Sequence, residues 1–242
     1  MSRLSRVGWK PLATELFIVF IGLLGALQVD DWQQHRELAQ TETVYLHRLN
    51  EDLASYIMYL KRGIPRLEQH RRGVEHVSAS LAAGHILNDD TDLFELGLIY
   101  LGHLPSANRP MSAYNEMVAS GVFARLQSTE LQRLVSDLYA TQAAVDKNFA
   151  WWRNQPLVVE QAIQPFVEYY SEGERVPSTN LSAPAYGVRI KYDFDKLAAD
   201  PVIRNGYFWA ADTHSDWVEW SNRLLDLAVA AEAIVAKELQ GR

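Results

Sequence analysis

The sequence lacks cysteine throughout its 242 residues, and it has no excess of positive charge. The absence of thiols excludes disulfide bonds, cysteine-based zinc sites, thiol catalysis and lipidation on cysteine. The formal net charge of −7 argues against nucleic acid as a partner. Catalytic signatures are also missing, since the chain has no G-x-S-x-G, H-E-x-x-H, P-loop or G-x-G-x-x-G motif. We therefore predict no cofactor, no motif-based metal site and no motif-based enzyme activity.

The charge that is present is unevenly distributed along the chain. Arg3, Arg6 and Lys10 precede residue 30 with a single acid, Glu15, which leaves 20 basic and 29 acidic residues, a net charge of −9, in residues 30–242. Hydrophobic residues make up 48% of the chain and charged residues 22%, which is ordinary for a folded protein. A basic tip, an apolar tract and an acidic body together predict an N-terminus inserted in a membrane.

The apolar tract runs without interruption over residues 16–27, and extends to 12–29 if a few polar residues are accepted. Eighteen helical residues would span roughly 27 Å, about the thickness of the hydrocarbon layer. Trp9 and Trp32 flank the tract as interfacial aromatic residues do. We favour an uncleaved signal anchor. A cleaved signal peptide would end after Ala26, where the small residue expected two positions earlier is missing, and a buried helix of a soluble protein is the third interpretation.

The signal-anchor interpretation fixes the domain boundaries and the location of the chain. It predicts a cytoplasmic tip at 1–11, a transmembrane helix at 12–29 and an extracytoplasmic domain at 30–242. Because the cations precede the tract, the N-terminus is expected in the cytoplasm and the body in the periplasm of a bacterium, with the chain held once in the inner membrane.

Two features of this tract predict association of membrane helices. Gly22 and Ala26 form a small-xxx-small pair, which lets two helix backbones approach closely. Glu15 is an ionisable group at membrane depth, where such groups usually find a partner. The alternative is that Glu15 lies near the interface and extends its carboxylate to water.

Beyond the tract, apolar residues recur at the three- and four-residue steps of an amphipathic helix. The stripe has one skipped position, near His70, and consists of Leu46, Leu49, Leu53, Tyr56, Leu60, Ile64, Leu67, Val74, Val77 and Leu81. The membrane helix is thus expected to continue to about residue 83, where Gly84 can end it. Gly63 and Pro65 predict a kink or a break on the way.

The rest of the chain predicts further helices joined by short links. Residues 88–91, up to Asp90 and Thr91, offer an N-cap for a short helix at 93–101, and Ser112 caps another at 113–120. Ser128 opens a longer helix that Pro156 and Pro165 kink or split and that runs to Tyr170. Asp200 caps a last helix that begins at Pro201 and runs to about 239. Residues 171–192 are expected to be a long loop, with a weak strand signal at 188–192. The predicted fold class is all-α, a transmembrane helix continuing into a bundle of long, kinked helices.

The side chains that could carry chemistry give weak signals. No two of the seven histidines are four residues apart, so we expect them to be scattered and solvated, although a metal site built across helices stays open. Aromatic residues are more suggestive, and they either line a ligand pocket or fill the core where helices cross. The candidate pocket residues are Tyr114, Trp152, Trp209, Trp217 and Trp220.

Two stretches resemble an uncharacterised family of bacterial single-pass membrane proteins. The first, residues 15–32, has the pattern E-x-x-x-(V/I)-x-x-G-x-x-x-A-L-Q-(I/V)-x-x-W, and is followed by Tyr45, Leu46, Leu49 and Glu51-Asp52-Leu53. The second consists of Ser112-Ala113-Tyr114, Ser120-Gly121, Leu126, Leu131 and Tyr139. The resemblance implies a single-pass anchor and a helical extracytoplasmic domain, and it brings no activity with it. Because Glu15, Gln28 and Trp32 match the family's pattern, the resemblance also implies that these three positions have a role in the membrane helix.

These observations predict a structural or assembly subunit rather than an enzyme. The expected partners are the lipid bilayer and either further copies of the chain or another membrane protein. One alternative is a sensor or small-ligand-binding module that uses the tryptophan-rich pocket. Another is an enzyme whose site is assembled from polar residues far apart in the sequence.

Overall fold

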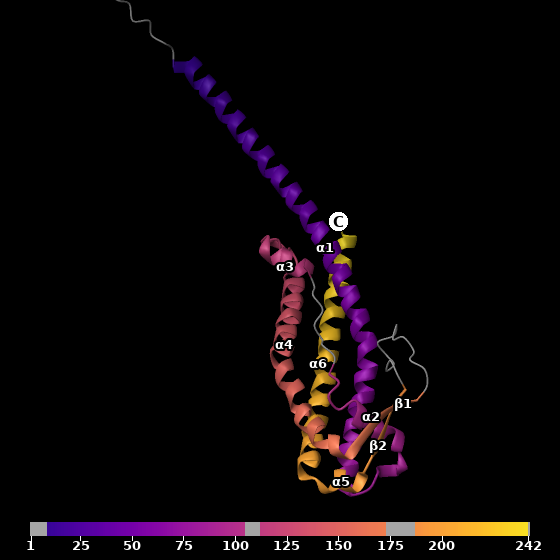
Figure 1. Ribbon diagram of the computed structural model, residues 1–242. Helices are drawn as coiled ribbons and strands as arrows, with labels where there is room; N and C mark the ends of the chain where they lie inside the picture. The colour runs from indigo at the N-terminus through magenta and orange to yellow at the C-terminus, as the bar shows by residue number, and fades with distance from the viewer. Residues whose placement is uncertain (1–8, 105–111, 173–186, 242) are drawn as a thin grey trace, which may run out of the picture. The chain divides into compact units, whose positions relative to one another are not determined.

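The computed structural model describes residues 9–104, 112–172 and 187–241 (Figure 1). Most side chains between residues 9 and 38, and several between 149 and 156, also lie outside this description. The chain divides into two compact units, residues 1–48 and 49–242. The first unit is described as one helix from Trp9 onward, and all further elements belong to the second unit.

Helix α1 (Trp9–Ala83) is a single helix of 75 residues that passes through Gly63 and Pro65. Of the kink or break expected there, the break is wrong, because the helix is continuous through both residues. Proline removes one backbone hydrogen bond from a helix, but Leu60 and Leu67 on either side are buried and hold the segment in place. The helix ends as predicted at Gly84, which has a φ of 77° and donates its N–H to the Ser80 carbonyl at 3.0 Å. That conformation suits glycine because it lacks a Cβ.

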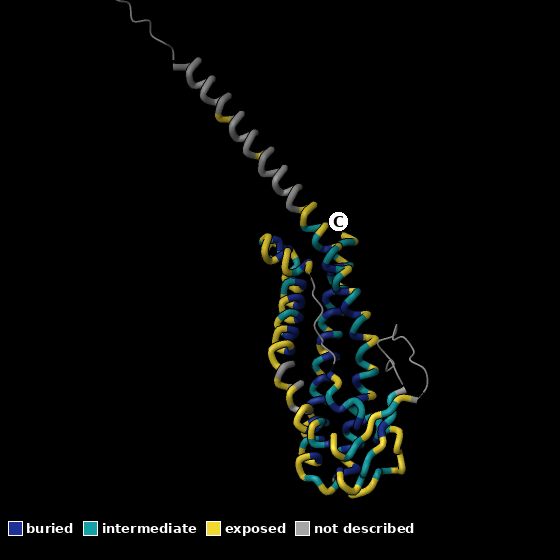
Figure 2. The backbone as a smooth tube through the Cα atoms, in the orientation of Figure 1, coloured by how far each residue is buried: buried dark blue, intermediate teal, exposed yellow. Residues whose placement is uncertain are grey.

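The hydrophobic stripe of α1 is confirmed as a buried face. Nine of its ten apolar residues are buried, and Ile64 is half-buried. Figure 2 shows buried positions along the inner sides of the helices in the second unit. The helical period in the sequence thus identified the face of α1 that packs against its neighbours.

The other helices are α2 (Thr91–Ile99), α3 (Ser112–Ala119), α4 (Thr129–Ile163), α5 (Phe194–Ala199) and α6 (Pro201–Gln240). Single 3₁₀ turns lie at Leu87–Asp89, Phe123–Arg125 and Gln164–Phe166. Three of the predicted N-caps are confirmed: the side chains of Asp90, Ser128 and Asp200 accept backbone N–H groups at the starts of α2, α4 and α6. Ser112, the expected cap of the next short helix, is instead the first residue of α3. Such caps satisfy donors that have no partner inside the helix.

A two-stranded antiparallel sheet departs from the prediction. β1 (Val167–Glu172) pairs with β2 (Gly187–Tyr192), with Glu168 opposite Lys191. The strand signal near 188–192 is therefore confirmed, whereas the helix expected through Tyr170 ends at Ile163. The segment after Ile163 is rich in valine and tyrosine, which favour strands once a partner strand is available. Arg189 of β2 lies 3.6 Å from Asp92 and 3.5 Å from Glu95, so the sheet is tied to α2.

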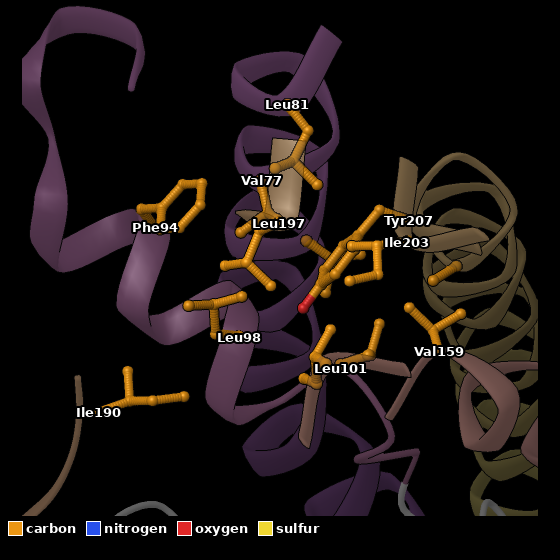
Figure 3. Close-up of a cluster of buried hydrophobic side chains, with 13 residues drawn as sticks. Val77, Leu81, Phe94, Leu98, Leu101, Val159, Ile190, Leu197, Ile203 and Tyr207 are labelled. Atoms are coloured by element: carbon orange, nitrogen blue, oxygen red, sulfur yellow. The ribbon is translucent and has the colours of Figure 1, made fainter. Parts of the chain in front are cut away.

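The described part of the chain is mostly helical, as predicted. α4 and α6 run antiparallel and pack along much of their lengths (Figure 1). A hydrophobic cluster lies where α1, α2, α4 and α6 meet α5 and β2 (Figure 3). Its buried members are Val74, Val77, Leu81, Phe94, Leu98, Leu101, Val159, Ile163, Ile190, Leu197, Ile203, Tyr207 and Ala210. This core fixes the start of α6 and the end of α2, which flank the site described next.

Candidate functional site

The skipped position in the α1 stripe is occupied by His70, whose residue is only 2% exposed. It follows Leu67 and precedes Val74, so it lies on the buried face of the helix. The expectation that the histidines are scattered and solvated is wrong for this residue and for His214, which is 1% exposed. The gap in an otherwise regular apolar stripe was the signal that could have identified His70.

Two further rings surround His70 at the end of α2. The imidazole of His70 stacks on the ring of Tyr100, with centroids 4.1 Å apart and planes inclined by 10°. The ring of His103 meets both edge-on, at 5.4 Å from His70 and 5.7 Å from Tyr100. A turn positions His103, whose backbone N–H donates to the Tyr100 carbonyl at 3.0 Å. We call His70, Tyr100 and His103 the three-ring cluster.

α6 contributes a third histidine close to this cluster. The Nε2 atom of His214 lies 2.9 Å from the backbone carbonyl of Leu101, within hydrogen-bonding distance. That contact joins the middle of α6 to the turn after α2. It also satisfies a carbonyl that would otherwise be buried without a donor.

The pKa of all three imidazoles is lowered, although His70 and His214 are buried and the His103 residue is exposed. Desolvation is the main cause at each ring, and it lowers the pKa of His70 to about 3. The neighbouring histidines and the Arg66 guanidinium lower the pKa of His70 further, while an interaction with the backbone of His103 opposes them. The rings are consequently neutral at pH 7, and each presents one lone-pair nitrogen and one N–H group.

An ionic network lies beside His214 on the same pair of helices. Arg71 on α1 contacts Glu75 at 2.6 Å and Glu68 at 2.9 Å, and the Ser215 hydroxyl of α6 donates to Glu75 at 3.2 Å. The network fixes α6 against α1 in this region. Within the described residues, no three histidine, aspartate or glutamate side chains are arranged to hold a metal ion.

The predicted aromatic pocket is not assembled by the described residues. Trp209 is 59% exposed and its ring meets the neighbouring Phe208 ring edge-on at 5.4 Å, whereas Trp217 is buried. Trp220 is half-buried beneath the Arg223 guanidinium at 5.5 Å. Trp209 and Trp220 are eleven residues apart, about 16 Å along the helix, so they do not form one wall. The side chain of Trp152 lies outside the described residues.

Tyr114, the remaining member of that set, belongs to a different aromatic group. Its ring stacks on Tyr139 of α4 at 3.6 Å and meets Phe123 edge-on at 5.0 Å. The adjacent Ala113 N–H donates to the Asp52 carboxylate of α1 at 2.9 Å. Tyr114 therefore helps to hold α3 against α4 and α1.

The residues predicted to mediate membrane-helix association lie at the edge of what the structure describes. The surroundings of Glu15, Gly22 and Ala26 lie outside what the structure describes, and Gln28 is exposed. Among the described residues, no helix has the length and apolarity needed to cross a membrane.

An exposed apolar surface on α4 and α6 was not anticipated. Trp151 and Val158 are seven residues apart on α4, as are Val202 and Trp209 on α6, so each pair lies on one face of its helix. All four are between 51% and 60% exposed. We call these four residues the α4–α6 apolar face.

The four residues are brought together by a close approach of the two helices. A Cβ atom on Gly206 would overlap the side chain of Val159, so the backbone of α6 lies directly against α4 at this point. On each helix, the exposed pair is displaced from that contact in the same direction around the helix axis. Because α4 and α6 run antiparallel (Figure 1), this displacement brings both pairs to the same side of the two helices. Contiguous exposed apolar side chains of this kind mark interaction surfaces.

Comparison with known proteins adds no relative. No protein-family model matches the chain, and neither curated proteins nor solved structures give a match.

Proposed function

We propose that this chain is a membrane-anchored helical protein that self-associates and serves as a structural or assembly subunit. Residues 12–29 cross the bacterial inner membrane, the N-terminus lies in the cytoplasm and the body lies in the periplasm. The charge pattern and the flanking tryptophans of the sequence support the anchor. Continuity of α1 from Trp9 to Ala83 supports a direct helical link from the anchor to the body.

The observation that carries the proposal is the α4–α6 apolar face. Two tryptophans and two valines are more than half exposed on one side of a helix pair, and burying the exposed part of each side chain would contribute roughly 1 kcal/mol. Two copies related by a two-fold axis would place one antiparallel helix pair against the other, as in a four-helix bundle. Tryptophan is also the residue type most enriched among energetically dominant contacts of protein interfaces.

The anchor favours this association in two ways. Tethering two copies to one membrane raises their effective concentration, so a modest interface is sufficient. Gly22 and Ala26 also allow close contact of two membrane helices, and Glu15 and Gln28 supply polar groups that such helices share. The membrane helix and the α4–α6 apolar face would then act together.

The test is the molar mass of the full chain in mild detergent, measured by light scattering after size exclusion. We expect a dimer or larger assembly for the natural sequence. The double variant Val158→Ser, Trp209→Ser should have a dimer dissociation constant roughly tenfold larger than that of the natural chain, because polar side chains remove the apolar contact. Val229→Ser is the matched control, since Val229 is also an exposed valine of α6 but lies far from the face. A monomeric natural chain, or a double variant that matches the control, contradicts the proposal.

The anchor and its orientation need a separate measurement. A reporter that is active only outside the cytoplasm, fused after Arg242, should be active, and alkaline carbonate should leave the full chain in the membrane fraction. Activity of a cytoplasm-specific reporter at the same position would overturn the orientation. Release of the chain by carbonate would overturn the anchor and leave the oligomer test unaffected.

A further inference from the structure

Arg66 lies beside the three-ring cluster, and among the described residues no carboxylate balances its charge. It lies on α1 one turn before His70, and its guanidinium influences the pKa of His70, Tyr100 and His103, so it is close to all three. Its Nε atom is buried and has no hydrogen-bond partner, and no carboxylate of the described residues pairs with it. In contrast, Arg71 on the same helix contacts two glutamates. A partly buried, unpaired guanidinium is costly unless an anion completes it.

His70 supplies a second unused group at the same place. Its Nδ1 atom is buried without a hydrogen-bond partner, although the residue is only 2% exposed. Because the ring is neutral and also interacts with the backbone of His103, Nδ1 presents a lone pair and needs a donor. Residues four positions apart on a helix have Cβ atoms about 5–6 Å apart. One small ligand can therefore reach Arg66 and His70 together.

The two unsatisfied atoms require opposite hydrogen-bonding properties from a single ligand. Arg66 Nε needs an acceptor, best an ionised oxygen, and His70 Nδ1 needs a hydroxyl donor. A phosphate group that retains a proton carries both an ionised oxygen and a hydroxyl donor on one phosphorus atom. Sulfate has the same shape but carries no proton near neutral pH, so it can satisfy only the arginine.

We propose that Arg66 and His70 form a binding site for a hydrogen-bearing phosphate group, either free phosphate or a phosphate monoester. The rings of Tyr100 and His103 wall the site. His70 is buried, Tyr100 is half-buried and His103 is exposed, so His103 is the outermost ring. His214 lies on the inner side and is engaged with the Leu101 carbonyl.

The experiment is calorimetric titration of the full chain in detergent at about pH 6, where free phosphate and much of a phosphate monoester retain a proton and sulfate does not. The probes are inorganic phosphate, sulfate and glycerol 3-phosphate. Saturable phosphate binding at least roughly tenfold tighter than sulfate binding is expected, since a hydrogen bond to a buried acceptor is lost with sulfate. Tighter binding of glycerol 3-phosphate than of phosphate assigns the site to monoesters, and the reverse order assigns it to the free ion. Equal affinity for phosphate and sulfate, or no binding of any probe, overturns the proposal.

Variants locate the binding. Arg66→Gln should weaken phosphate binding by roughly tenfold or more, because a charge-assisted contact is lost. His70→Phe keeps the stacked ring but removes the acceptor, so it should abolish the preference for phosphate over sulfate. Arg72→Gln is the control, because Arg72 is exposed on the same helix. Unchanged selectivity in His70→Phe, or equal losses in Arg66→Gln and Arg72→Gln, contradicts the assignment whatever the oligomeric state.

Discussion

The ring of His70 lies parallel to the ring of Tyr100, 4.1 Å away, where α1 meets the end of α2. The pair fills a core position with a titratable group that is neutral at pH 7. An apolar residue there would pack equally well, so the histidine introduces a sensitivity to acid that hydrophobic packing does not need. Its consequences can be measured separately from any ligand.

Acid should destabilise the folded chain through the buried histidines. The pKa of His70 is lowered from 6.5 to about 3 in the folded state, so between these values the unfolded chain binds more protons. Stability is therefore complete above about pH 6.5 and falls as the pH decreases toward 3, by at most ~1.4 kcal/mol per pH unit from this residue. The lowered pKa values of His103 and His214 act in the same direction. Urea unfolding at a series of pH values measures the slope.

His70→Phe should flatten that slope while leaving the stacked contact with Tyr100. The control is His47→Gln, because His47 is exposed on the same helix. We expect the control to keep the slope of the natural chain. If the phenylalanine variant also retains the full slope, the burial of His70 is not the cause of acid sensitivity.

Two glycines of the second unit should respond in opposite ways to alanine. A Cβ on Gly97 of α2 would overlap the backbone carbonyl of Gly73 of α1, so Gly97→Ala must separate the helices, at a cost of about 1–3 kcal/mol. Gly63 has no atom within 4 Å of the corresponding position, so Gly63→Ala should stabilise α1 by up to ~1 kcal/mol. Thermal or urea unfolding of both variants gives the comparison. A Gly97→Ala protein as stable as the natural chain would show that α1 and α2 do not approach this closely.

Asp52 should stabilise the start of α3 from a distance of 61 residues in the sequence. Its carboxylate accepts the Ala113 N–H at 2.9 Å, a donor that α3 cannot satisfy internally. Asp52→Ala should cost about 0.5–2 kcal/mol, as losses of helix caps do. Asp52→Asn retains an acceptor and should lose less. Glu51→Ala, at an exposed neighbour, should be near neutral. Equal effects of Asp52→Ala and Glu51→Ala in urea unfolding would exclude the capping role.

The sequence was sufficient for the helices whose signals are local. The α1 stripe, the glycine that ends α1 and the caps at Asp90, Ser128 and Asp200 depend on residues within a turn or two, and the structure confirms them. The pairing of β1 with β2 depends on residues about twenty positions apart, so the helical expectation for residues 167–170 had no local contradiction. Continuity through Pro65 was likewise decided by packing and not by the backbone preference of proline.

The site was less accessible to sequence reasoning. His70, His103 and His214 have no common spacing, and they meet only because α2 turns back on α1 and α6 packs beside them. The skipped stripe position at His70 was visible in the sequence, but its meaning depended on knowing that Tyr100 covers it. The α4–α6 apolar face was not predicted for the same reason. A helix with apolar residues on more than one face does not show in its sequence which face is buried until its neighbours are known.

Site-specific crosslinking in native membranes tests the central claim of self-association most directly. The natural chain has no cysteine, so a single Asn205→Cys substitution gives the only thiol. Asn205 is exposed and lies between Val202 and Trp209 on the same side of α6, so this variant keeps all four residues of the face. Around a two-fold axis the same face meets itself, and a mild oxidant should therefore produce a disulfide-linked dimer band that a reductant removes. Val229→Cys, on the same helix and away from the face, should stay uncrosslinked. An Asn205→Cys protein that stays uncrosslinked, or that crosslinks no better than Val229→Cys, would contradict self-association through the α4–α6 apolar face.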